Sequence, residues 1–129
     1  LMGVEYEAPA ELTNDEYPIL LTTGRMLYQY NISTRQSRVL DALAPGERAE
    51  INPVDAAAIG VTEGESIRVT SRRGSVVTGV TLTDRVPPGT MFMTFHFHET
   101  PVNQLTNSAY DPISNTAEYK VSAVRIEKV

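Results

Sequence analysis

Apolar and polar residues alternate along residues 65–84 (ESIRVTSRRGSVVTGVTLTD), on both sides of Arg73 and Gly74. An alternation of period two places successive side chains on opposite faces of an extended strand. Glycine allows the tight turn that joins two such strands. The stretch therefore predicts a β-hairpin.

Three further stretches have the apolar character of strands. Residues 19–21 form an apolar run that ends in Thr22, Thr23 and Gly24, and Gly24 is a point where the backbone can turn or be approached closely. A proline-glycine turn precedes the strand-like residues 90–95, and residues 121–126 are strand-like near the end of the chain.

Two stretches predict helices instead. In residues 33–46, Val39, Leu40 and Leu43 have helical spacing, and a proline and a glycine follow them. In residues 50–64, Asn52 suits a helix N-cap and Gly60 suits the C-terminal stop. Strands outnumber helices without regular alternation, which predicts a mainly β fold with short helices, a small closed barrel rather than a doubly wound sheet.

Composition limits the classes of function. The net charge of −5 over 129 residues argues against broad nucleic-acid binding, which needs a basic face. The absence of cysteine excludes disulfides, thiolate metal sites and a cysteine nucleophile, and favours a cytoplasmic location. No apolar run approaches the roughly 20 residues that span a bilayer, so membrane insertion is not expected.

The first residues differ from the rest of the chain. Residues 1–18 (LMGVEYEAPAELTNDEYP) are acidic, contain two prolines and show no periodicity. We expect residues 1–16 to be a flexible linker or the cut end of a larger protein, and residues 17–129 to form one domain.

The segment FHFHE, residues 95–99, contains residue types that could bind a metal ion. On a strand, His96 and His98 would point to the same face, and Glu99 follows them. A structural zinc site needs more ligands than these, and the chain has no third histidine and no cysteine. We expect polar contacts at a strand end instead, beside Phe95 and Phe97 in the core, or a hydrogen bond to a ligand.

The sequence favours binding over catalysis. No serine lies in a nucleophile elbow, and the pair Gly74 and Ser75, which would permit the self-cleavage of pyruvoyl enzymes, is more often a simple turn. Amides and hydroxyls in residues 101–107 and 110–120 suit recognition of a heterocycle. The cations that could meet an anionic ligand are Arg25, Arg35, Arg38, Arg72, Arg73 and Lys120, of which Arg72 and Arg73 are expected to be solvated surface charges beside a turn.

The chain resembles a known family in the order and spacing of six stretches: LLTTGRMLYQYN, EINPVDAAAIGV, IRVTSRRGSV, FHFHETPVNQLTN, DPIS and EYKVSAVRI. This family is the molybdopterin dinucleotide-binding domain at the C-terminus of the large subunit of molybdenum and tungsten oxidoreductases, and the formate dehydrogenase branch is the most similar. The resemblance covers residues 17–129 and implies a double-psi β-barrel with inserted helices.

The resemblance also implies the ligand, a bis(molybdopterin guanine dinucleotide) that carries molybdenum or tungsten. Its implied contacts are Thr23, Gly24, Arg25, Met26, Leu27, Tyr28, Gln29, Tyr30, Asn31, Ile32, Asn103 and Lys120. At Tyr28, Tyr30 and Asn31, relatives often carry histidine. Phe95 would lie toward the metal end of the cofactor, so that His96 and His98 would face the substrate funnel.

No catalytic residue or metal ligand is expected in this chain, and any iron-sulfur cluster would belong to other domains of the parent oxidoreductase. Those domains or subunits are the implied partners, and the separate domain is expected to be inactive. The alternatives are the same domain of a nitrate reductase or a formylmethanofuran dehydrogenase, a small self-processing decarboxylase, and a non-catalytic interaction barrel.

Overall fold

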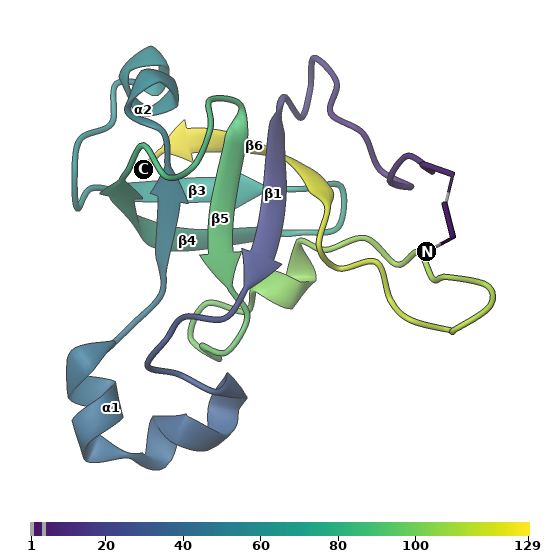
Figure 1. The fold of residues 1–129 in the computed structure, drawn as a ribbon. Helices are drawn as coiled ribbons and strands as arrows, with labels where there is room; N and C mark the ends of the chain where they lie inside the picture. The colour runs from purple at the N-terminus through teal and green to yellow at the C-terminus, as the bar shows by residue number, and fades with distance from the viewer. Residues whose placement is uncertain (1, 4) are drawn as a thin grey trace.

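Six strands close into a barrel in the computed structural model, which describes residues 2–3 and 5–129 (Figure 1). The elements in chain order are β1 (Ile19–Gly24), η1 (Asn31–Gln36), α1 (Arg38–Leu43), β2 (Arg48–Ile51), α2 (Pro53–Ile59), β3 (Ser66–Thr70), β4 (Ser75–Leu82), β5 (Thr90–Thr94), η2 (Val102–Gln104) and β6 (Ser122–Lys128). The order of strands around the barrel is β1-β5-β2-β4-β3-β6. The expected mainly β fold, a double-psi β-barrel with short helices, is confirmed.

Two pairs of neighbouring strands in the barrel are parallel, β1 with β5 and β2 with β4. In the pair β1–β5, Leu21 lies opposite Met91, and in the pair β2–β4, Ala49 lies opposite Val80. All four side chains are fully buried. These pairs, which join strands far apart in sequence, therefore also build the centre of the hydrophobic core.

Helix α2 lies at one end of the barrel and α1 at the other (Figure 1). The predicted caps of α2 are confirmed: the side chain of Asn52 accepts a hydrogen bond from the N–H of Val54 at 3.0 Å, and Gly60 adopts a left-handed conformation with φ 67°. The hairpin of β3 and β4 is confirmed with its turn at residues 71–74. None of the helices in the described part of the chain has the length and apolar character needed to cross a bilayer.

Two details of the sequence analysis need correction. Strand β2 was not predicted, because its four residues run directly into the cap of α2. Arg73 is exposed as expected, but it is not free in solvent: its guanidinium pairs with the Glu11 carboxylate and donates to the Leu105 carbonyl at 2.7 Å. Arg72 also pairs with Glu11, at 3.2 Å, so the turn of the hairpin is tied to the N-terminal segment.

Candidate functional site

The C-terminal end of β1 meets the segment that precedes β6. The Lys120 ammonium donates a hydrogen bond to the Thr23 carbonyl at 2.8 Å, and the Thr23 hydroxyl donates to the Tyr119 carbonyl at 2.8 Å. Antiparallel pairing of β1 with β6 holds the two segments side by side. Two predicted ligand contacts that lie 97 residues apart in sequence are thereby brought into direct contact.

Two cations lie on one aromatic ring beside this junction. The Arg25 guanidinium carbon is 5.4 Å from the Phe95 ring centre, and the Lys120 ammonium nitrogen is 5.5 Å from it. Arg25 also lies 5.0 Å from the Tyr30 ring centre, and its Nε donates to the Asn31 side chain at 2.8 Å. Such contacts hold cations in place while both side chains stay exposed to solvent. We call Arg25, Phe95 and Lys120 the cationic cluster.

The other predicted ligand contacts between β1 and α1 differ in burial: one is buried, and the rest are half-buried or exposed. Gln29, only 2% exposed, donates from its side chain to the carbonyls of Leu40 and Ala44 and accepts from the Thr34 hydroxyl, so it supports α1 from within. Leu27, Tyr28, Tyr30 and Ile32 are exposed, and Met26 is half-buried.

Asn103 lies in η2 and is exposed, and its carbonyl accepts a hydrogen bond from the Thr106 hydroxyl at 3.0 Å. Within the described residues it forms no hydrogen bond with Thr23 or Lys120.

Gly24 makes room for a neighbouring ring rather than for a turn. A methyl group at Gly24 would lie 2.7 Å from the Cε2 atom of Phe92. Gly24 is the last residue of β1 and pairs with Thr94. Of the turn and the close approach that the sequence left open, the structure shows a close approach, made by the Phe92 ring of β5, and the ligand contact at Gly24 stays a prediction.

The two histidines do not share a face, contrary to the expectation for a strand, because β5 ends at Thr94. His96 is 3% exposed between Phe95 and Phe97, and neither ring nitrogen finds a partner among the described residues. Burial lowers the pKa of His96, and the charges of Arg35 and Arg25 lower it further.

His98 is exposed, with its Nδ1 atom 3.3 Å from Glu99. Among the described residues no group of three potential metal ligands is present.

Glu47 was missed by the sequence analysis. It lines a groove of about 580 Å³ with Met26, Tyr28 and Phe92, and it accepts hydrogen bonds from the backbone N–H of Thr94 at 3.0 Å and from the Thr94 hydroxyl. Burial raises the pKa of Glu47 to about 7, since the hydrogen bonds from Thr94 only partly offset the loss of water. No local pattern reveals this carboxyl, because its partner lies 47 residues away.

Known proteins match this chain over most of its length. A family model described as the molydopterin dinucleotide binding domain matches residues 19–123. The F420-dependent formate dehydrogenase 2 subunit alpha of Methanococcus maripaludis is 45% identical over 129 residues, which cover 98% of this chain and 19% of that protein. A nitrate reductase of Symbiobacterium thermophilum is 41% identical over 126 residues, which cover 93% of this chain and 17% of that protein.

One solved structure shows the same fold at low sequence identity. Acetylene hydratase from Pelobacter acetylenicus superposes with a TM-score of 0.80 at 17% identity, over 97% of this chain and 21% of that one. The chain thus spans about a fifth of the length of these larger proteins. Because the family model matches from β1 into β6, the chain belongs to the molydopterin dinucleotide-binding domain family.

Proposed function

We propose that the cationic cluster binds the diphosphate of a molybdopterin guanine dinucleotide, and that the chain is the C-terminal domain of a formate dehydrogenase alpha subunit. The observation that carries this proposal is the placement of Arg25 and Lys120 on the single ring of Phe95. A diphosphate needs positive charge and several N–H donors within a short span. The family membership supports a molybdopterin ligand.

The donors of the cationic cluster fit a diphosphate. Arg25 donates a hydrogen bond from Nε to the side chain of Asn31. Within the described residues no acceptor pairs with the two terminal nitrogens of Arg25, so both can donate to one phosphate. Lys120 uses one of its three N–H donors for the Thr23 carbonyl and keeps the others for an anion. The contact with Thr23 fixes the ammonium in place, so that little side-chain entropy remains to be lost on binding.

The remaining predicted contacts complete the proposed site. Thr23, Gly24, Met26–Ile32 and Asn103 would surround the rest of the dinucleotide, some through backbone groups and Gln29 indirectly through the support of α1. The cofactor, with molybdenum or tungsten, supplies the redox chemistry when bound. This chain would orient it, while iron-sulfur clusters and catalytic residues would come from other parts of the parent subunit, its proposed partners.

The proposal extends to organisation and location. Residues 17–129 would form the binding domain and residues 1–16 the segment that leads into it, and a cytoplasmic location is proposed from the lack of cysteine. The separate chain would not oxidise formate. Formate-dependent dye reduction by the purified 129-residue chain would overturn that statement.

Formate dehydrogenase is favoured over nitrate reductase by the curated relatives. Three formate dehydrogenase alpha subunits match at 38–45% identity over almost the whole chain. The nitrate reductase at 41% identity keeps the second assignment open as the alternative. Joining this domain to the rest of its parent subunit, loading the cofactor and assaying formate against nitrate would decide between the two.

An NMR titration with guanosine diphosphate tests the binding site. We expect saturable shifts at the amides of residues 23–32 and of Lys120, with smaller shifts at Asn103. The variant Lys120→Met should weaken binding about tenfold or more, because a charge-assisted contact contributes roughly 1.5–3 kcal/mol.

Lys128→Met is the matched control. Lys128, at the opposite end of β6, pairs with Glu65, and its loss should leave the affinity unchanged. Equal weakening by both variants, or an absence of shifts in the wild type, would contradict the proposed site.

A further inference from the structure

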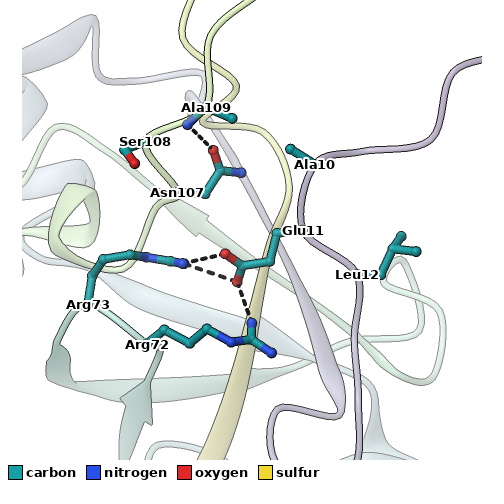
Figure 2. Close-up of a pocket in the computed structure, with 8 residues that line it drawn as sticks. All are labelled: Ala10, Glu11, Leu12, Arg72, Arg73, Asn107, Ser108 and Ala109. Atoms are coloured by element: carbon teal, nitrogen blue, oxygen red, sulfur yellow. Dashed lines mark hydrogen bonds and ion pairs between the residues drawn. The ribbon is translucent and has the colours of Figure 1, made fainter.

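Glu11 belongs to the N-terminal segment, and its carboxylate faces Arg72 and Arg73 of the turn between β3 and β4 (Figure 2). It also accepts a hydrogen bond from the start of β6. One oxygen accepts from the backbone N–H of Ala123 at 2.7 Å and lies 3.2 Å from Arg72. Arg73 donates to both oxygens. The Glu11 side chain is only 11% exposed. Its contacts tie the turn between β3 and β4 to the start of β6.

The contacts continue from Arg73 into the loop after η2. The same terminal nitrogen of Arg73 that bonds Glu11 at 3.1 Å donates to the Leu105 carbonyl at 2.7 Å. Two residues later, Asn107 donates its backbone N–H to the Ser122 hydroxyl at 3.1 Å and its side chain to the Val121 carbonyl at 2.7 Å. The loop from η2 to Asn107 is thereby held against the residues that directly follow Lys120.

The charge of Glu11 is retained in this position. Burial raises its pKa, but the hydrogen bonds from Arg73 and Ala123 and the charges of the two arginines outweigh that effect, and the net pKa lies below the usual value for glutamate. A carboxylate that meets a guanidinium fork makes strong and directional hydrogen bonds. Glu11 thus accepts as an anion at neutral pH.

We infer that Glu11 is a positioning residue for the ligand site: through Arg73 and Ala123 it fixes the loop that carries Asn103 and the segment that carries Lys120. The inference rests on the proposed function for the role of those two residues. It assigns the N-terminal segment a role in holding the ligand site in place. Glu11 itself touches no ligand.

Amide hydrogen exchange on the ligand-free 129-residue chain tests the anchoring. In Glu11→Ala, we expect the amides of Gln104, Leu105 and Asn107 to exchange roughly ten- to a hundredfold faster, as the loss of a charged hydrogen bond permits local opening. The amides of β5 should keep their rates. Equal acceleration in β5 would mean that Glu11 only stabilises the fold globally, and unchanged loop amides would mean that it anchors nothing; either result overturns the inference.

The two neighbouring arginines provide a matched comparison. Both pair with Glu11, but only Arg73 donates to Leu105, so Arg73→Met should accelerate exchange at Leu105 and Arg72→Met should not. Glu7→Gln, an exposed glutamate of the same segment, is the control for charge alone. Equal effects of the two arginine variants would contradict the proposed route through Arg73.

Guanosine diphosphate binding connects the anchoring to function. Glu11→Ala should weaken binding severalfold, with the altered shifts confined to Asn103 and Lys120 while those of residues 23–32 persist. If the wild-type chain binds no guanosine diphosphate, the proposed function fails, and the exchange experiment still decides the anchoring without a ligand. If the wild type binds and Glu11→Ala binds equally well, the positioning role fails alone.

Discussion

At the scale of single residues, two buried titratable groups give the fold opposite responses to pH. Glu47 has a pKa of about 7 in the folded chain against 4.5 when unfolded, because it is taken out of water. The pKa of His96 is lowered for the same reason. A raised carboxyl pKa disfavours the folded state as pH rises, and a lowered histidine pKa disfavours it as pH falls.

The response of Glu47 is tested with the variant Glu47→Gln. Between about pH 4.5 and 7 the folded chain keeps a proton that the unfolded chain has released, so stability should fall across this window, by about 3 kcal/mol at most. The variant should remove that fall and be more stable than the wild type at pH 8. Urea unfolding measured at pH 5 and pH 8 checks this. A wild type and a variant with parallel pH profiles would contradict it, and exposed Glu5→Gln is the control.

The response of His96 can be read directly by NMR, since the chain contains only two histidines. The ring of His96 should stay neutral to a pH below 6.5, the usual midpoint, because protonation would place a charge in a buried position near Arg25 and Arg35. Stability should correspondingly decrease as pH falls below 6.5. The ¹⁵N shifts of the two rings are assigned with His98→Gln. A midpoint of 6.5 or higher for His96 would show that the ring is solvated or paired.

At the scale of elements, local signals predicted the parts that are defined by neighbouring residues. Asn52 and Gly60 bracket α2, and the alternation about Gly74 marks the hairpin, because caps and tight turns need particular residue types. Strand β2 lacked such a signal. The ends of β5 and β6 depend on pairing with distant strands: β5 pairs with β1 and β2, and β6 pairs with β1 and β3. The family resemblance named Thr23 and Lys120 as separate ligand contacts, but their contact with each other was not predicted, because no local pattern relates residues 97 positions apart.

The packing of β1 on β5 makes a prediction for Gly24. In Gly24→Ala the new methyl group would overlap the Phe92 ring, which must then move, at a cost of about 1–3 kcal/mol in the free energy of unfolding. The cost should shrink in a Phe92→Leu background, because the shorter side chain leaves space for the methyl group. Urea unfolding of the two single variants and the double variant measures the coupling. Additive effects would mean that the ring does not limit this position.

At the scale of the whole molecule, the proposed site lies where the first strand, β1, pairs with the last strand, β6. Arg25 directly follows β1 and Lys120 precedes β6, and antiparallel pairing of these strands helps to close the barrel. Local opening that separates β1 from β6 would therefore break both the barrel and the cationic cluster. A ligand that bridges Arg25 and Lys120 should consequently oppose unfolding of the entire chain.

This coupling predicts a global stabilisation by guanosine diphosphate. A ligand that binds only the folded chain adds about 2.7 kcal/mol to the free energy of unfolding at a concentration of 100 Kd. Amides of β3 and β4, remote from the cationic cluster in sequence, should gain the same protection against exchange as those of β1. At the same ligand concentration Lys120→Met should lose about half of the gain or more, because its binding is about tenfold weaker or worse, and Lys128→Met should keep the gain. Protection restricted to residues 23–32 would show instead that the ligand orders a loop, and that β1 and β6 separate independently of the rest of the barrel.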